Sequence, residues 1–330
     1  MSSFKCFETT IAQVHEAMLA GKLTCRQLVE YYLKRIEAYD QKGPALNSII
    51  LVNPKALEEA DALDAALKEK GLTGALHGIP IILKDNVDTY DMATTAGSLS
   101  LKGFVPEDDA YITRKLREAG AIILAKSNLH EFAIWGETIS SILGQTLNPY
   151  DLTRTPGGSS GGTGAAMAAN FGLAGIGTDT INSIRSPSSA NSLVGIRPTI
   201  GLVSRDGIVP YSFTQDTAGP ICRTVADAVA VLDVIAGYDK ADDETAWCCG
   251  KIPKTYKAFL NKDGLKGKRI GILESFFGKD EVHKEVNKPV RESIEMLKEN
   301  GAELISITEE INSGWLTSSV SVHLENFKDH

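Results

Sequence analysis

The most distinctive stretch of the sequence is Gly157-Gly158-Ser159-Ser160-Gly161-Gly162-Thr163-Gly164, which leads into an Ala-rich run. A second serine-containing segment, Gly177-Thr178-Asp179-Thr180-Ile181-Asn182-Ser183-Ile184-Arg185, follows shortly after it. Glycine has no Cβ atom, so these positions let the backbone approach other groups closely and adopt positive φ. A loop of this kind at the start of a helix presents N–H groups and hydroxyls, which suit either anion binding or a nucleophilic serine.

Two phosphate-binding motifs are excluded for this glycine–serine loop. It lacks the Gly-Lys-Ser/Thr ending of a P-loop, and its glycine spacing does not fit a dinucleotide fingerprint. The letters G-x-S-x-G of a nucleophile elbow are present at 157–161. An elbow, however, requires a strand that runs directly into it, and Thr153-Arg154-Thr155-Pro156 precedes this loop. A plain tight turn is the simplest alternative, and the second serine segment counts against it.

Composition indicates an ordinary soluble globular protein. The 330 residues are 43% hydrophobic and 23% charged, enough for one large α/β domain or two smaller ones with an ample core. The formal net charge of −8 gives no indication of a nucleic-acid surface or of binding to an anionic membrane. We therefore expect neither nucleic acid nor membrane as a partner.

The N-terminus and the cysteines indicate a cytoplasmic protein. The first residues lack an apolar signal-peptide core, and no stretch approaches 18 apolar residues. Five cysteines are scattered, and the vicinal pair Cys248-Cys249 lacks the C-x-x-C spacing of zinc or redox sites, so free thiols in a reducing compartment are expected. There is no metal-ligand cluster or cofactor motif, and we predict neither metal nor cofactor.

The first 75 residues are predicted to be mainly helical. Apolar residues repeat at helical spacing over 11–18, and Thr24 with Gln27 three residues later forms a capping box for a second helix. A third helix is expected to have Asn53 as its N-cap and Pro54 in its first position, and to end at Gly71. A brief extended segment over 49–52 precedes it.

From Gly78 onward, short apolar runs alternate with helical patterns. The expected strands are 79–83, 121–125, 173–176, 269–273 and 302–307, and the expected helices lie around 112–116, from 163 onward, at 224–235 and at 286–297. This alternation predicts the α/β class, with a mixed, largely parallel central sheet covered by helices on both faces. The last residues, from Val320, read as the opening of a helix without a cap. A naturally frayed end is one interpretation, and a C-terminally incomplete domain is the one we adopt.

A serine nucleophile needs a base, and Lys84 is the best candidate. None of the six histidines has a suitable local context. Lys84 ends the apolar run Ile79-Pro80-Ile81-Ile82-Leu83. Burial disfavours the ammonium form and lowers the pKa of a lysine, so that a neutral amine can take a proton from a serine. A plain surface charge at a strand end remains the alternative.

The run from Gly78 to Pro210 resembles the amidase signature family. The segments that carry the resemblance are Gly78–Asn86, Arg154–Gly162, Gly177–Thr180, Ser183–Arg185 and Gly195–Thr199. The helical N-terminus and the later α/β region also fit, so the resemblance covers essentially the whole chain. It implies a single amidase-type domain over 1–330, with a helical region at 1–75, a catalytic core at 76–210 and a later, truncated α/β part at 211–330.

The resemblance also implies a Ser–cis-Ser–Lys triad. Ser183 would be the nucleophile, and Ser159, after a cis peptide bond to Gly158, would bridge it to Lys84 as general base. The main-chain N–H groups of the oxyanion hole would come from Thr180, Ile181, Asn182 and Ser183. Attack on a small-molecule amide would release ammonia or an amine and leave an acyl group on Ser183.

Three residues are expected to support this triad. By resemblance, Asp179 and Arg185 would orient the loop that carries the nucleophile, and Ser160 would support the lysine side by hydrogen bonding. The resemblance also makes a homodimer possible.

Two departures from the family pattern concern the pocket. The family commonly has Gly-Gly before the nucleophile, whereas this chain has Ile181-Asn182. A β-branched isoleucine adopts positive φ poorly, so a loop that required it would have a distorted oxyanion hole. We favour the alternative, in which Ile181 narrows the pocket and Asn182 adds a polar contact. The chain is also shorter than its relatives, and an incomplete pocket could leave the triad present with poor activity.

Three functions are therefore compared. The first is an amidase that hydrolyses a small carboxamide. The second is the glutaminase subunit of a transamidating complex, which would use the same triad to release ammonia for a partner. The third is a non-catalytic binding or assembly protein that keeps the fold.

Overall fold

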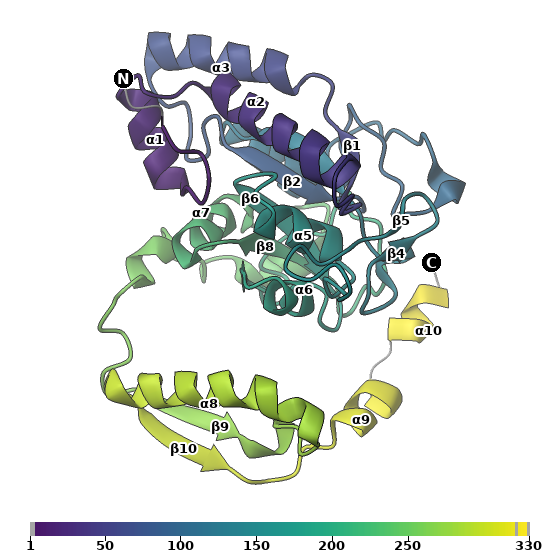
Figure 1. Cartoon of the computed structure of the whole chain (residues 1–330), viewed down its shortest axis with the longest axis vertical. Helices are drawn as coiled ribbons and strands as arrows, with labels where there is room; N and C mark the ends of the chain where they lie inside the picture. Colours follow the sequence, from purple (N-terminus) through teal and green to yellow (C-terminus); the bar gives the residue numbers. More distant parts are fainter. Residues whose placement is uncertain (1–3, 321–322, 329–330) are drawn as a thin grey trace. The chain divides into compact units, whose positions relative to one another are not determined.

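The computed structural model describes residues 4–320 and 323–328, which form two compact units (Figure 1). Residues 4–256 and 323–328 make up the first unit, and residues 257–320 make up the second. The chain therefore leaves the first unit after Tyr256 and contributes its last described helix to that unit. The predicted end segment from Val320 includes residues 321–322, which lie outside the described residues.

The centre of the first unit is, among the described residues, a six-stranded sheet with the order β1-β3-β2-β6-β8-β7. Its strands are β1 (Ile49–Val52), β2 (Pro80–Lys84), β3 (Ile122–Ser127), β6 (Ala174–Asp179), β7 (Val194–Gly195) and β8 (Thr217–Cys222). Strands β3, β2 and β6 are parallel neighbours, whereas β1 and β8 run in the opposite direction and β7 is antiparallel to β8. Four of these six strands thus share one direction, which confirms the predicted mixed, largely parallel sheet.

Helices cover both faces of this sheet (Figure 1). The first unit contains α1 (Ile11–Leu19), α2 (Cys25–Arg35), α3 (Ala56–Lys70), α4 (Tyr111–Glu118), α5 (Gly161–Ala168), α6 (Arg185–Ala190), α7 (Val225–Ile235) and α10 (His323–Lys328), and a small hairpin of β4 (Ile139–Ser140) and β5 (Gly144–Gln145). Helices α5 and α6 contact each other, as do α4 and α7. A Cβ atom on Gly175 of β6 would lie 2.5 Å from the Thr163 side chain of α5, so α5 packs directly on the sheet. This packing brings the N-terminus of α5 to the carboxyl ends of β2 and β6.

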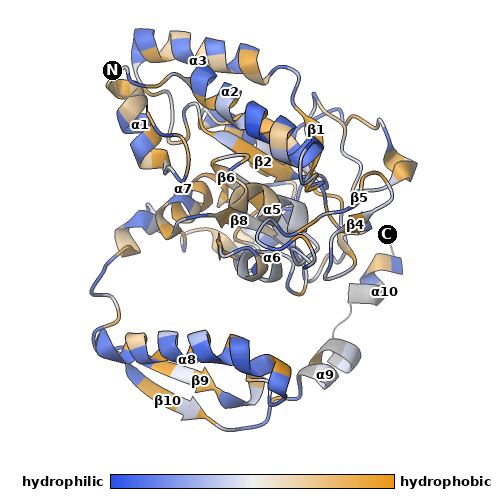
Figure 2. Cartoon of the chain, viewed as in Figure 1, coloured by the Kyte–Doolittle hydropathy of each residue, from blue (hydrophilic) through white to orange (hydrophobic). Residues whose placement is uncertain are grey.

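Local sequence signals account for several of these elements. Thr24 caps α2 and forms the predicted capping box with Gln27. Every residue of β2, β3, β6 and β8 is buried, which is why β2 and β3 read as continuous apolar runs. In Figure 2, β2 is coloured as hydrophobic, while α2 alternates between hydrophilic and hydrophobic residues, as expected for a helix with one face on the core. Within the described ranges, no helix combines the length and apolar character that crossing a membrane would require.

The predicted start of α3 was wrong. The helix begins at Ala56, and Pro54 lies in the turn before it. The Asn53 side chain does accept a hydrogen bond from the N–H of Lys55 at 2.8 Å, but its amide donates to the carbonyl of Ile123 at 2.8 Å. Asn53 is thus fixed by the end of the sheet as well as by the turn, and this tertiary contact moves the start of the helix.

The second unit contains a β–α–β arrangement. Strands β9 (Arg269–Leu273) and β10 (Glu303–Ile307) pair in parallel, and α8 (Lys284–Glu299) connects them. Helix α8 continues through Pro289, whose carbonyl accepts a hydrogen bond from the Ser293 hydroxyl at 2.8 Å. The short helix α9 (Ser313–Trp315) follows β10.

Gly158 occupies the tightest part of the glycine–serine loop. A Cβ atom there would lie 1.9 Å from the carbonyl oxygen of Glu137, which is main chain and cannot move aside. We therefore expect Gly158→Ala to lower the free energy of unfolding by about 3 kcal/mol or more, measured by urea denaturation. Gly136→Ala is the matched control, because no heavy atom lies within 4 Å of its added methyl group. Equal urea midpoints for the two variants would contradict this packing.

Candidate active site

Lys84 lies at the carboxyl end of β2 and is completely buried. Its Nζ atom donates hydrogen bonds to Ser159 Oγ and to Thr178 Oγ1, both at 2.7 Å. Burial lowers the pKa of Lys84 to about 7, while the negative charges of Asp216 and Asp179 act in the opposite direction. Near neutral pH a large fraction of the Lys84 side chains is therefore uncharged and able to accept a proton.

The two serines of the glycine–serine loop have different partners. The peptide bond between Gly158 and Ser159 is cis, and the Ser159 carbonyl accepts a hydrogen bond from the N–H of His130 at 3.1 Å. The Ser160 hydroxyl donates to the carbonyl of Thr178 at 3.1 Å and accepts from its N–H at 3.2 Å. Ser159 thus contacts the lysine directly, whereas Ser160 reaches it through Thr178.

Ser183 lies in the turn between β6 and α6 and is buried, with 6% of its surface exposed. In the described part of the chain, no hydrogen bond joins its hydroxyl to Ser159 or to Lys84. The structure therefore brings together two of the three predicted triad residues by direct hydrogen bonding. The third lies at the end of the neighbouring strand β6, because β2 and β6 are paired in parallel.

Asp179 fixes the turn that carries Ser183. Its buried carboxylate accepts hydrogen bonds from the N–H of Ile184 at 3.0 Å and from the guanidinium of Arg185 at 3.2 Å. Arg197, which the sequence analysis did not single out, donates to the same carboxylate at 3.2 Å. Hydrogen bonds between a guanidinium and a carboxylate are stronger than those between neutral groups. The bonds from Arg185 and Arg197 therefore fix Asp179, which in turn holds the N–H of Ile184 at the end of the turn.

The Ile181-Asn182 replacement leaves an ordinary backbone. Neither residue has positive φ, and the Ile181 side chain is 36% exposed. Outside helices and strands, the described main chain includes no hydrogen bond donated by the N–H groups of Ile181, Asn182 or Ser183. The loop therefore shows no distortion of the kind that a positive φ at Ile181 would cause. That Ile181 narrows the pocket stays a prediction, because this residue is not among those that line the cavity described below.

A model of the amidase family matches residues 27–323. The chain belongs to the amidase family. A probable amidase of Arabidopsis thaliana is 44% identical over an alignment 283 residues long, and the match covers 82% of this chain and 54% of that protein. A glutamyl-tRNA(Gln) amidotransferase subunit of Acinetobacter baumannii is 42% identical over 299 residues, which are 90% of this chain and 59% of that protein.

Solved structures show the same relationship. The native peptide amidase from Stenotrophomonas maltophilia matches 98% of this amidase chain with a TM-score of 0.92 and 44% identity. The match covers 66% of the peptide amidase. The chain therefore spans a little over half the length of the curated amidase relatives above and about two thirds of this structure. The predicted family and fold are confirmed.

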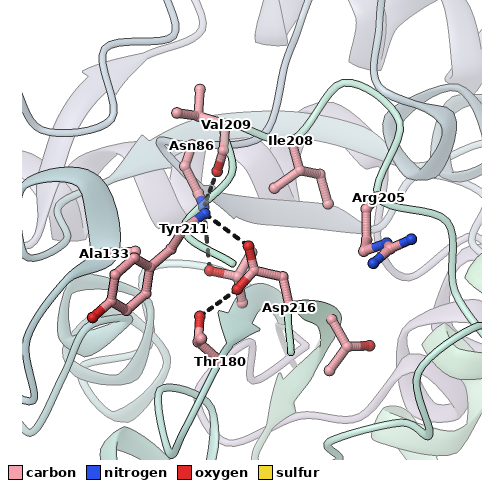
Figure 3. A pocket seen from close by; sticks show the side chains of 10 residues that line it. Asn86, Ala133, Thr180, Arg205, Ile208, Val209, Tyr211 and Asp216 are labelled. Carbon is pink, nitrogen blue, oxygen red and sulfur yellow. Dashed lines mark hydrogen bonds between the residues drawn. The ribbon is translucent and has the colours of Figure 1, made fainter. Parts of the chain in front are cut away.

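A small cavity lies at the carboxyl ends of β2 and β6 (Figure 3). Thr178, whose hydroxyl binds Lys84, lines it, and Asn86 donates a hydrogen bond to the same hydroxyl at 3.2 Å. The other lining residues are Ala133, Thr180, Arg205, Ile208, Val209, Tyr211, Asp216 and Thr217. Polar groups at the carboxyl ends of two neighbouring parallel strands, β2 and β6, thus face one small cavity.

Three of these residues were missed as site residues by sequence reasoning. Asn86 and Thr178 stand inside the motifs already quoted. Side chains two residues apart in an extended segment lie on one face, so this alternation could have placed the side chains of Lys84 and Asn86 together. Asp216 lies outside every motif, and no local signal identifies it.

Proposed function

We propose that this amidase-family chain carries the catalytic part of an amidohydrolase, which cleaves a carboxylic amide to an acid and ammonia or an amine. The hydrogen bond between Lys84 and Ser159 carries this proposal. A buried amine with a pKa near 7 is a suitable general base at neutral pH, and a serine hydroxyl bound to it can relay a proton.

The reaction would proceed in two halves. Ser183 Oγ attacks the amide carbonyl carbon while its proton passes to Ser159, and the Ser159 proton passes to Lys84 Nζ. The tetrahedral intermediate then breaks its C–N bond, and the leaving nitrogen takes the proton back along the same path. An ester between the acyl group and Ser183 remains, and a water molecule activated by the same relay hydrolyses it to the acid.

Main-chain donors would stabilise the negative oxygen that forms in each half. We assign this role to the N–H groups of the segment Thr180 to Ser183, as predicted. Donors of this kind are worth roughly 3–4 kcal/mol each when they are already oriented. The bonds from Ile184 and Arg185 to Asp179 support that orientation, because they anchor the residues that follow the segment.

A substrate screen tests this function. The chain is incubated with aliphatic and aromatic carboxamides, peptide amides and glutamine, and released ammonia is measured. We expect ammonia from at least one carboxamide without any partner protein, and none from the Ser183→Ala variant. A folded wild-type chain that releases no ammonia from any of these amides would contradict the proposal.

A glutaminase function within a transamidating complex is the second candidate, favoured by the 42% identity to the amidotransferase relative. Such a chain would release ammonia from glutamine, and a partner protein would be needed for full activity. Glutamine hydrolysis that rises only when a partner is added would select this candidate over a stand-alone amidase. The expected small-molecule substrate, the absence of nucleic acid and membrane partners, and the possible homodimer remain predictions.

A further inference from the structure

Asp216 stands immediately before β8 and lines the cavity at the carboxyl ends of β2 and β6. One carboxylate oxygen accepts a hydrogen bond from the Thr180 hydroxyl, and the other accepts from the N–H groups of Tyr211 and Ser212 at 2.7 and 2.8 Å. Figure 3 shows the carboxylate between Thr180 and Tyr211. A single side chain therefore connects two segments of the cavity wall.

The sheet fixes the position from which Asp216 makes these bonds. The next residue, Thr217, is paired with Asp179 in the antiparallel ladder of β6 and β8. Asp216 is the residue before β8, and Thr180 is the residue after β6. Since Thr217 and Asp179 are partners, Asp216 and Thr180 lie next to each other just beyond the paired strands. Through its hydrogen bond with the Thr180 hydroxyl, the Asp216 carboxylate joins the two chain segments one residue beyond the paired strands. Its bonds from the N–H groups of Tyr211 and Ser212 connect both segments to the turn at 211–212.

Asp216 differs from the other carboxylate near Lys84 in its partners. Among the described residues, the hydrogen-bond donors to Asp216 are all neutral. Arg205 lines the same cavity, but its guanidinium is bound to Asp242, with Nε donating at 2.8 Å. Two carboxylates influence Lys84: Asp216, and Asp179, which is paired with Arg185 and Arg197. Within the described residues, Asp179 thus forms ion pairs with arginine side chains, whereas Asp216 forms none.

We propose that Asp216 is a positioning residue of the amide-cleaving site, which holds Thr180 and the 211–212 turn together so that the Thr180 main chain faces the substrate carbonyl. This inference rests on the function proposed above. The charge of Asp216 has a second consequence, because an anion beside Lys84 favours the ammonium form. Its removal should let the lysine stay neutral to a lower pH.

The test uses Asp216→Asn, which keeps the size of the side chain and removes its charge. We expect kcat to fall about 10- to 100-fold, with a smaller change in KM. The reason is that the main-chain N–H groups at Thr180 would move, and these groups stabilise the transition state more than the bound substrate. We also expect the acidic limb of kcat/KM to move to lower pH. Unchanged kcat together with an unchanged pH profile would overturn the inference.

Thr180→Val separates the two effects. It removes the hydroxyl that donates to Asp216 but leaves the charge in place, so kcat should fall without a shift of the acidic limb. Because both changes break the same contact, the double variant should lose less than the product of the two single losses. If Asp216→Asn fails to fold, Thr180→Val alone decides, and an unchanged kcat would overturn the inference.

Asp239→Asn is the matched control. Asp239 is buried, whereas Asp216 is half-buried. Like Asp216, Asp239 accepts hydrogen bonds from a hydroxyl, that of Ser204 at 2.6 Å, and from a main-chain N–H, that of Ala241 at 3.1 Å, but it does not line this cavity. Its variant should lose stability and keep the wild-type pH profile.

Failure of the proposed function and failure of the inference about Asp216 can be told apart. Wild-type activity equal to that of Ser183→Ala overturns the function, whereas an active wild type with an unaffected Asp216→Asn overturns only this inference.

Discussion

Ser183→Ala is expected to lower kcat for amide hydrolysis by roughly 10⁴-fold or more, because no acyl-enzyme can form without the Ser183 hydroxyl. KM and the unfolding midpoint should change little, since the described structure pairs that hydroxyl with no other group. Initial rates of ammonia release, measured over enzyme concentrations high enough to detect the residual rate, give the ratio. Turnover that survives the substitution would remove Ser183 from the mechanism.

Ser189→Ala is the control for this variant, because Ser189 lies on helix α6, which follows the turn that carries Ser183, and is exposed. It should keep wild-type activity. A fluorophosphonate probe provides a second readout that does not require the true substrate. The wild type and Ser189→Ala should be labelled at Ser183, and Ser183→Ala should not be labelled. A well-folded wild type that the probe fails to label would favour the non-catalytic alternative.

Lys84→Met is expected to lower kcat about 10³- to 10⁴-fold, because it removes the general base and leaves the rest of the site in place. The wild type should show kcat/KM rising with pH through about 7, since burial lowers the pKa of Lys84 to that value and the uncharged amine is the active form. The variant should lack this limb. Rate measurements between pH 5 and 9, with the exposed Lys22→Met as control, test both points.

The same substitution should stabilise the fold at neutral pH. The pKa of Lys84 is about 7 in the folded chain and near 10.5 when unfolded, so the unfolded chain binds more protons between these values. Stability of the wild type therefore increases as pH rises through this window. Thermal unfolding at pH 7 should show a higher midpoint for Lys84→Met than for wild type, and the difference should shrink towards pH 10. An unfolding midpoint at pH 7 that is lower for Lys84→Met than for wild type would contradict a buried amine with a lowered pKa.

Local signals identified much of the fold. The capping box at Thr24 and the apolar runs of β2 and β3 are properties of short segments, and each gave the correct element. Strand β8 was missed, because Gly219-Pro220 interrupts its sequence and resembles a turn. The strand is nevertheless interior, since its pairing with β6 and β7 places it between them.

The residues of the candidate site also separate into those that local sequence could predict and those that it could not. The end of an apolar run singled out Lys84, and Ser159 and Ser183 were predicted from the family resemblance, because all three residues stand in segments that carry it. The partners Thr178 and Asp216 could not be predicted in the same way. Thr178 reaches Lys84 through the parallel pairing of β2 with β6, and Asp216 reaches Thr180 through the antiparallel pairing of β6 with β8. Strand register between distant segments is set by the packed core, and no local pattern reports it.

The crowding around the glycine–serine loop limits how this chain could be engineered. A Cβ atom on Gly161 or Gly162 would lie 2.2 Å from Thr138 Oγ1 or from the Asn128 carbonyl oxygen. Randomised libraries at these positions should return mostly misfolded protein. Ile181 and Asn182 are exposed and have unstrained φ, so directed evolution of substrate preference should find its tolerated changes there.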